Sequence, residues 1–385
     1  MLRFLTAGES HGPGLVAVVE GLPAGLRVEA KGIAHELARR RLGLGRGARM
    51  RIEQDELEIL AGVRHGFTLG SPVAVVIRNT EWPRWQDEMG VEVPEGDHTK
   101  KPLTKPRPGH ADLTGMLKYD TKDARDILER ASARETAART VVGYLARQLL
   151  DVVGVFVLSH VVAIGSVWAR VGVLPTAADL EAIDASPVRC FDPAAETEMI
   201  AAIEAAKADR DTIGGVVEVI AHGLPAGIGS HVHWDRRLDA RLAEALMSIP
   251  AIKGVEVGDG FTSAGRPGSV AHDEIFYDRE FFRQTNRAGG TEGGMTVGGP
   301  LRVRAAMKPI STVLKGLQTV DVTTKQAESA FYERSDTCAV PAAGVVAEQM
   351  VAIVLAQELQ RQFGGDTVGD LAGAVARYRE RVERY

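Results

Sequence analysis

LVAVVEGLPAG, residues 15–25, recurs in the second half of the chain as GVVEVIAHGLPAG, residues 215–227. In both copies an apolar run rich in Val ends at a Gly-Leu-Pro-Ala-Gly segment, which is typical of a strand that leads into a tight turn. Two more pairs follow in the same order: TLGSPVAVVI from Thr68 with TVGGPLRVRA from Thr296, and ERAS at 129–132 with ERSD at 333–336. Three ordered matches predict an internal repeat, although Gly and Pro turns also resemble one another by chance.

The repeat predicts two related halves, about 1–150 and 211–365, within one domain that spans 1–385 and has a pseudo-two-fold axis. Each half would hold a strand, the PAG turn, a helix, a pair of strands and a long helix. Residue composition and periodicity predict helices at 30–42, 126–151, 235–248 and 340–363, and a strand in the β-branched run 152–167. The connector 151–210 also carries surface helices at 176–184 and 192–210, and the tail 366–385 predicts a final exposed helix.

Composition narrows the class of protein. The chain has 385 residues, of which 45% are hydrophobic, so it can bury a large core. Its net charge of -5 lacks the basic field that holds nucleic acid. Only two cysteines occur, and neither a signal peptide nor an apolar run of membrane-spanning length stands out. We therefore expect a cytoplasmic enzyme with no nucleic-acid or membrane partner.

Two glycine-rich turns in the first half each contain a histidine. Arg107-Pro-Gly-His110-Ala-Asp112 places a guanidinium, an imidazole and a carboxylate in a stiff turn of the loop-like segment 80–125, which we expect to cover an active site. His11 lies between Gly8 and Gly12 directly after an apolar run. Imidazole titrates near neutral pH, so both histidines are candidates for proton transfer. A surface loop and a buried structural histidine are the alternatives.

An arginine-rich run follows the first predicted helix. Six arginines, at 39, 40, 41, 46, 49 and 51, lie among three glycines over residues 39–51. The planar guanidinium binds phosphate and carboxylate in a bidentate manner, and glycines let the backbone approach the ligand. The run predicts a site for a small polyanion. Nucleic acid is the alternative, but the run is short and contains no aromatic residue.

A metal site and a cysteine nucleophile are less well supported by the sequence. His231 and His233 would lie on one face of a strand, but the spacing supplies no third ligand, so we assign no metal. Cys338 stands in an apolar context, which favours packing over catalysis.

These features together resemble the chorismate synthase family. The matching motifs, in family order, are AGESHG from residue 7, ARRRLGLGRGARMRIE from 38, NTEW from 79, RPGHAD from 107, RASARETAAR from 130, GLPAGIG from 223, AIKGVEVG from 251, NRAGG from 286, MKPIST from 307 and RSDTCAVPAAGVVAE from 334. They extend from residue 7 to about 350. So many separated and uncommon motifs make the resemblance specific.

The resemblance implies an activity. It implies a 1,4-elimination of phosphate and a proton from 5-enolpyruvylshikimate 3-phosphate, which gives chorismate in the shikimate pathway with reduced FMN as cofactor. It also implies an α+β fold in which two antiparallel sheets form a sandwich with helices, and a homotetramer. A non-catalytic protein that binds phosphate ligands, and a flavin reductase without elimination chemistry, are the competing classes.

The resemblance also implies roles for individual residues. His11 matches the acid that protonates the departing phosphate, His110 the acid that protonates reduced flavin, and Asp336, with Ser10 and Ser132, the group that helps to return the substrate's proton. The matched flavin contacts are Arg130, Ala131, Ser132, Pro250, Ala251, Gly293, Lys308, Pro309, Ile310, Ser311, Thr312 and Arg334, where Pro250 could act only through its backbone. The matched substrate or NADPH contacts are Arg40, Arg46, Arg49, Arg107 and Arg134, and NADPH is a possible reductant.

Overall fold

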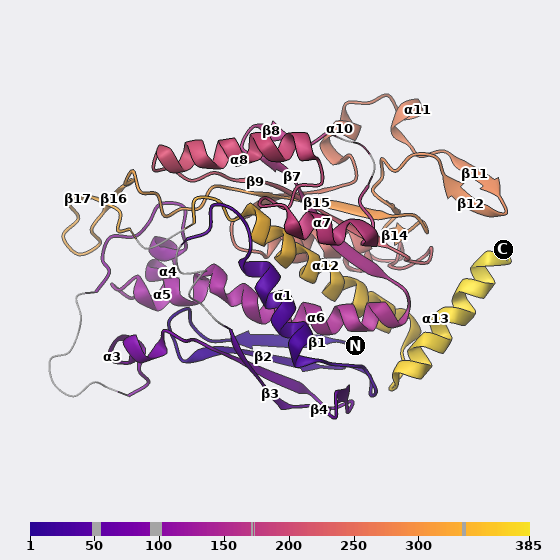
Figure 1. Cartoon of the computed structure of the whole chain (residues 1–385), viewed down its shortest axis with the longest axis horizontal. Coiled ribbons are helices and arrows are strands. Elements are labelled where there is room, and N and C mark those ends of the chain that lie inside the picture. The colour runs from indigo at the N-terminus through magenta and orange to yellow at the C-terminus, as the bar shows by residue number, and fades with distance from the viewer. Residues whose placement is uncertain (48–54, 93–101, 171, 173, 333–335) are drawn as a thin grey trace.

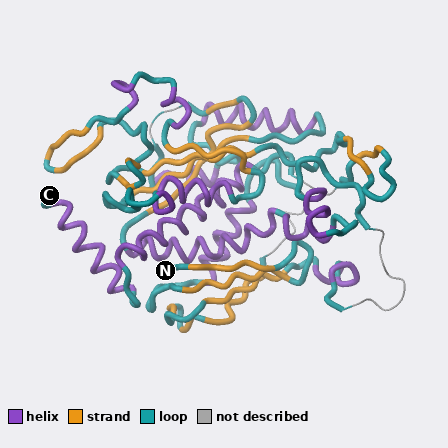
Figure 2. The backbone as a smooth tube through the Cα atoms, turned by 180° about the vertical axis from the view of Figure 1, so that it is seen from behind, coloured by secondary structure: helices purple, strands orange, loops and turns teal. Residues whose placement is uncertain are grey.

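The computed structural model describes the whole chain except residues 48–54, 93–101, 171, 173 and 333–335. Two antiparallel sheets lie on opposite sides of a layer of helices (Figures 1 and 2). The fold is therefore of the mixed α+β type. The C-terminus lies at one end of the molecule, and the N-terminus lies nearer its middle, before the first strand (Figure 1).

The first sheet is built from the N-terminal part of the chain. Its strands are β1 (Arg3–Ala7), β2 (Gly14–Glu20), β6 (Val73–Arg78) and β3 (Glu56–Ala61), in the order β1-β2-β6-β3. In β2, the alternate residues Leu15, Ala17 and Val19 are buried, whereas Val18 and Glu20 are exposed. Because successive side chains of a strand point to opposite faces, one face of this sheet packs on the helices.

The second sheet has the order β10-β15-β9-β7-β8. Its strands are β10 (Ile252–Val257), β15 (Leu301–Met307), β9 (Gly215–His222), β7 (Phe156–Ile164) and β8 (Val167–Trp168). The predicted strand at 152–167 thus contains β7, which pairs with β9 along its whole length. The connector therefore contributes a central strand as well as the helices α7 (Leu180–Ala185) and α8 (Pro193–Ala208).

The layer between the sheets consists of α1 (Ala30–Arg41), α6 (Thr136–Val152), α9 (Leu238–Met247) and α12 (Val340–Phe363). Helix α12 begins and ends where the sequence predicts. It is long and apolar enough to cross a membrane, but its most apolar stretch is 94% buried inside the protein. It packs against α6 and against β7 and β9 of the second sheet, so it is the core helix of the fold.

The prediction of one continuous helix over 126–151 is wrong at one point. The structure has α5 (Arg125–Ala131), a short 3-10 turn η2 (Ala133–Glu135) and then α6. Ser132 between them is extended, and its Oγ accepts a hydrogen bond from the backbone N–H of Arg134. Serine is a strong N-cap because its side chain satisfies a backbone donor at a helix start. The break places the start of α6 at the cavity described below.

The two PAG turns make the same hydrogen bonds. The Thr68 hydroxyl donates to the carbonyl of Pro23 at 2.5 Å and accepts from the backbone N–H of Leu26 at 2.9 Å. In the second half, the Thr296 hydroxyl donates to Pro225 at 2.6 Å and accepts from Ile228 at 2.9 Å. The threonine of the second motif thus closes the turn of the first motif in each half. Both threonines are buried.

The remaining elements are short or peripheral. They are β4 (Val63–Arg64), β5 (Phe67–Thr68), η1 (Trp82–Arg84), α3 (Gln86–Met89), α4 (Asp112–Tyr119), η3 (Ala177–Asp179), η4 (Trp234–Arg236), α10 (Gly260–Ala264), α11 (Gly268–Ala271), β11 (Ile275–Asp278), β12 (Glu280–Arg283), β13 (Thr291–Glu292), β14 (Met295–Thr296), β16 (Gln318–Val320), β17 (Ala327–Ser329) and α13 (Val368–Glu383). Helix α13 is the predicted C-terminal helix, and Thr367 with Asp370 forms a capping box at its start.

Candidate active site

A cavity of about 430 Å³ opens where the helices α6 and α12 begin. Ala133 and Arg134 line it from η2 and Thr136 from the start of α6, and Ala339, Ala342 and Ala343 line it from the start of α12. The other lining residues are Ser10, His11, Arg40, Arg46, Gly47, Arg107, Gly109, His110, Ala111, Leu128, Ala131, Ser132, Ile249, Pro250, Ala251, Met307, Lys308, Ile310, Ser311, Thr312, Asp336 and Val346. Segments far apart in sequence therefore meet at one place.

The cavity lining holds more cationic than anionic side chains, and two of its arginines pair with carboxylates behind the lining, Arg107 with Asp112 at 2.9 Å and Arg134 with Asp55 at 2.6 Å. Among the described lining residues, Asp336 is the one carboxylate, and it faces the cations Arg40, Arg46, Arg107, Arg134 and Lys308. The N-termini of α6 and α12 add the positive ends of two helix dipoles. A helix N-terminus surrounded by arginines is suited to phosphate and carboxylate groups. The lining thus offers partners for a small molecule that carries several negative charges.

The loop that carries His11 is fixed by Asn79. The Asn79 side-chain amide donates to the carbonyls of Glu9, Ser10 and Gly12, at 3.2, 3.3 and 2.7 Å. Its carbonyl oxygen accepts from the Arg134 guanidinium at 3.0 and 3.2 Å. Asn79 is the first residue of the NTEW motif, so this motif holds both a histidine loop and a cavity arginine in place.

The His11 ring is held from two further sides. Its Nδ1 lies 2.9 and 3.0 Å from the carboxylate oxygens of Glu129, which is buried in α5. The ring stacks on Trp85, with 3.9 Å between the ring centroids. Burial alone would raise the pKa of Glu129, but hydrogen bonds from His11 and Arg125 and the His11 charge hold that pKa below its usual range. Glu129 is therefore ionised near neutral pH.

His110 has a similar environment on the RPGHAD turn. Its Nδ1 lies 2.5 Å from Asp112, whose side chain is fully buried at the start of α4. Arg107 donates to Asp112 from its backbone N–H at 3.1 Å and from Nε at 2.9 Å. Burial would raise the pKa of Asp112, but these contacts with His110 and Arg107 place it well below its usual range. The predicted cluster of guanidinium, imidazole and carboxylate is thus a real contact cluster.

Asp336 links the arginine-rich run to the start of α12. One of its carboxylate oxygens accepts from the backbone N–H of Gly47 at 2.6 Å, and the other lies 2.6 Å from the Arg46 guanidinium. The N-cap of α12 is Ala339, and no side chain caps that helix start. Asp336 is therefore engaged with the cavity arginine and does not cap the helix.

The remaining predicted residues in the cavity form two groups. The Ser132 hydroxyl donates to the Ser10 hydroxyl at 3.2 Å, so the two predicted serines are in contact. The segment 308–312 faces the RPGHAD turn: Lys308 Nζ donates to the carbonyl of Gly109, and Arg107 donates to the Thr312 hydroxyl at 3.1 Å. Pro250 and Ala251 line the same cavity from the turn before β10.

Three predicted flavin contacts lie elsewhere in this structure. Arg130 does not line the cavity; its guanidinium donates to the carbonyls of Thr6 and Gly8 at the end of β1. Gly293 lies in the turn between β13 and β14, and Pro309 lies in the 308–312 segment without lining the cavity. Arg49 and Arg334 fall outside the described residues.

The arginine-rich run is divided between the cavity and the core. Arg40 and Arg46 line the cavity, but Arg39 is buried and pairs with Glu36 at 2.7 Å and with Glu348 at 2.8 Å. Glu348 is completely buried in α12, and Arg147 also pairs with it. The prediction that the whole run binds a polyanion is therefore wrong for Arg39, which is part of an internal ion-pair network.

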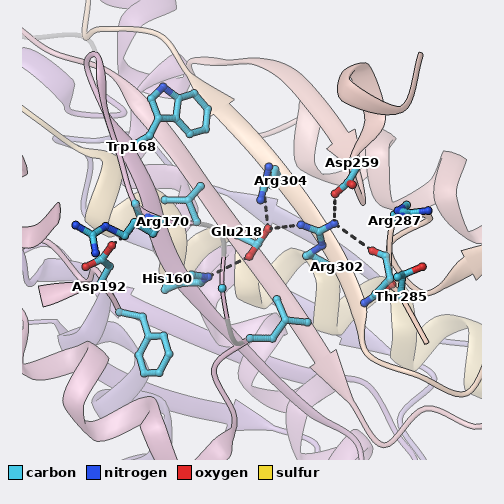
Figure 3. A pocket seen from close by; sticks show the side chains of 16 residues that line it. His160, Trp168, Arg170, Asp192, Glu218, Asp259, Thr285, Arg287, Arg302 and Arg304 are labelled. Atoms are coloured by element: carbon cyan, nitrogen blue, oxygen red, sulfur yellow. Dashed lines mark hydrogen bonds and ion pairs between the residues drawn. The ribbon is translucent and has the colours of Figure 1, made fainter. Parts of the chain in front are cut away.

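A second cavity, of about 340 Å³, lies on the outer face of the second sheet (Figure 3). Its centre is Glu218 on β9, which lies 3.2 Å from His160 Nε2 and 2.6 Å from Arg304 Nε. Arg302 lies between Glu218 and Asp259 and pairs with Asp259 at 2.5 Å. These lining charges are thus paired with one another.

The structure also places the metal and cysteine candidates. His231 and His233 are exposed and lie in bends, so the expectation that they alternate on a strand is wrong. In the described part of the chain, no three His, Cys, Asp or Glu residues form a metal-binding group. Cys190 and Cys338 are both free and buried, and burial raises the pKa of the Cys338 thiol to about 11. Cys338 is therefore a packing residue.

Comparison with known proteins places the chain in a family. Residues 2–360 match the family model described as chorismate synthase. A chorismate synthase of Acidothermus cellulolyticus is 63% identical over 96% of each chain, and one of Salinispora tropica is 59% identical over 98% of each. A solved crystal structure of chorismate synthase is 41% identical and covers 100% of this chain and 99% of its own, with a TM-score of 0.80. The chain belongs to the chorismate synthase family.

Proposed function

We infer that this chain is a chorismate synthase, a carbon–oxygen lyase of the class EC 4.2.3.5, and that the cavity between α6 and α12 is its active site. The substrate, 5-enolpyruvylshikimate 3-phosphate, carries a phosphate and two carboxylates. The observation that carries the assignment is the cavity lining, in which five cations and two helix starts surround one carboxylate. Such a site stabilises a polyanion and the charge that develops on a departing phosphate.

The residues of the cavity also fit reduced FMN. Ala131, Met307, Ala342 and Val346 give an apolar wall that suits a flat ring, and Lys308, Ser311 and Thr312 offer donors for its polar groups. When bound, reduced flavin supplies the electron density that lets phosphate leave without net redox change. NADPH as a reductant would use Arg40 and Arg46, which line the same cavity.

The chain's own residues hold and move the protons. We propose that His11 donates a proton to the phosphate as it leaves and that His110 holds a proton beside the flavin. Asp336, with Ser10 and Ser132, would help to return the substrate's proton. Each histidine reaches the cavity and is held by a buried carboxylate, so each presents its ring in one orientation.

We also propose an internal repeat, a cellular location and an oligomeric state. The matched hydrogen bonds of the two PAG turns support two repeated halves, 1–150 and 211–365, joined by 151–210 in one sandwich domain with a C-terminal tail at 366–385. The family resemblance supports a cytoplasmic homotetramer. Superposition of the halves by one rotation, pairing Pro23 with Pro225 and Pro72 with Pro300, tests the repeat.

An anaerobic assay separates this function from its alternatives. Purified protein is mixed with photoreduced FMN and 5-enolpyruvylshikimate 3-phosphate, and chorismate is measured by its absorbance. We expect chorismate only when all three are present. A protein that only binds anions would bind the substrate without converting it. A flavin reductase would form no chorismate, and in a separate incubation without this substrate it would oxidise NADPH with FMN.

A further inference from the structure

In the part of the chain that the structure describes, three histidines have the same kind of partner, a buried carboxylate that an arginine also holds. Two of these triplets border the active-site cavity: Arg125–Glu129–His11 and Arg107–Asp112–His110. The third, Arg304–Glu218–His160, lies in the other cavity, on the outer face of the second sheet (Figure 3). Glu129 differs from Asp112 in lying far from its histidine in sequence, outside any motif that contains His11.

We propose that Glu129 is the positioning residue for His11, which fixes its tautomer and its protonated form so that Nε2 serves as the proton donor at the cavity. The proposal rests on the function inferred above for His11. Glu129 is not among the residues that line the cavity, so it would act only through the imidazole.

The geometry specifies the tautomer. Glu129 is ionised near neutral pH and therefore only accepts hydrogen bonds. His11 Nδ1, within 2.9 Å of its Oε1, must then carry the hydrogen and donate it. The same carboxylate also accepts from the backbone N–H of His11 at 2.8 Å, which fixes the ring relative to its own backbone. The proton exchanged with the substrate is therefore the one on Nε2.

Charge and packing restrict the ring further. Arg125 donates to Glu129 at 2.9 Å and lies over Trp85, 5.1 Å from the ring centroid, while Trp85 stacks on His11. The Glu129 side chain is 1% exposed, so water does not screen the pair. The other charged and titratable groups that line the same cavity are Arg40, Arg46, Arg107, Arg134, Lys308, His110 and Asp336. Among the described residues, Glu129 is the carboxylate in contact with the His11 ring itself.

The first test uses Glu129→Gln, which keeps the shape but removes the negative charge and lets the side chain donate. We expect kcat to fall on the order of 10²-fold, the lower end of what a positioned general acid contributes, with KM within a factor of about three. The alkaline limb of the kcat/KM profile should move to lower pH, because the carboxylate no longer favours the protonated ring. Glu129→Asp, which keeps the charge, should recover part of kcat and most of the pH profile.

Glu218→Gln is the matched control, because it removes the carboxylate of the same kind of triplet away from the active site. It should leave kcat and the pH profile unchanged. Equal loss of kcat in both variants, or a lower kcat in Glu129→Gln with an unmoved pH limb, would show a general effect of burial and overturn the proposal. Melting temperatures of all variants identify any that fail to fold, in which case Glu129→Asp alone supplies the comparison.

A second readout does not depend on activity. In protein labelled with ¹⁵N-histidine, with no ligand added, we expect His11 to carry its hydrogen on Nδ1 and to titrate at lower pH in Glu129→Gln, while His160 is unchanged. An identical His11 spectrum in both proteins would contradict the proposal. If the wild type makes no chorismate, the inferred function fails, and this spectrum still decides whether Glu129 controls the imidazole.

Discussion

At the scale of single residues, the cavity joins residues that the sequence already singles out. His11, His110, Ser10, Ser132, Arg107 and Asp336 all line it. Glu129 and Asn79, which hold His11 and its loop, are missed as site residues because they lie far from His11 in sequence. The only signal was their position in the ERAS and NTEW motifs, and no spacing rule relates those motifs to the AGESHG loop.

Asp336 gives the sharpest prediction at this scale. Asp336→Asn keeps the size of the side chain but removes the charge that pairs with Arg46 and the basicity that a proton acceptor needs. We expect turnover to fall roughly 10²-fold while flavin still binds. Anaerobic stopped-flow with reduced flavin already bound measures chorismate formation directly. Asp259→Asn, whose charge is paired in the second cavity, should form chorismate at the wild-type rate; a full-rate Asp336→Asn would exclude the carboxylate from catalysis.

At the scale of elements, the regular spacing of apolar residues predicts where helices lie. It does not predict a local break within a helix. The sequence predicts helix α12 at its observed bounds because its helical pattern of apolar residues is continuous. No Gly or Pro near either end conflicts with those bounds. The break at Ser132 was not predicted, because Arg125–Ala131 and Thr136–Val152 both favour helix on their own. The pairing of β7 with β9 depends on tertiary contacts that no single segment encodes.

The two PAG turns predict equal responses to the same substitution. Thr68→Val and Thr296→Val each remove a buried hydroxyl that donates to a proline carbonyl and accepts from a backbone N–H. Each should lower the free energy of unfolding by about 1–3 kcal/mol, because buried polar backbone groups lose their partner. Denaturant unfolding measures this, with the Thr→Ser variants as controls that keep the hydroxyl. A large loss at one turn and none at the other would count against equivalent turns.

At the scale of the whole molecule, buried ion pairs connect distant segments to the core. Glu348 of α12 contacts Arg39 of α1 and Arg147 of α6. The sequence shows these charges only as parts of an arginine-rich run and two helices. Their pairing follows from how the helices pack between the sheets, so the arginine-rich run on its own wrongly groups Arg39 with the ligand-binding residues. The family resemblance fixed the general fold, whereas this network required the structure.

Acid stability is a property of the whole molecule that the site carboxylates should control. The pKa values of Asp112 and Glu129 lie below the ordinary 3.8 and 4.5, so both carboxylates stabilise the fold above those values. That stability is lost as the pH falls below these ordinary pKa values toward the lower pKa values of the folded state. The melting temperatures of Asp112→Asn and Glu129→Gln should therefore fall less than that of the wild type between pH 7 and pH 3. The exposed control Glu204→Gln should follow the wild type; identical pH dependence in all four proteins would be inconsistent with these pairings.

The most direct measurement is a crystal structure of the protein with FMN and 5-enolpyruvylshikimate 3-phosphate bound together. We expect both ligands in the cavity at the starts of α6 and α12, with the substrate's anionic groups on the arginines and with His11 and His110 in contact with the ligands. Ligands bound instead around Glu218 in the second cavity, or at any place where neither histidine reaches them, would contradict the proposed active site.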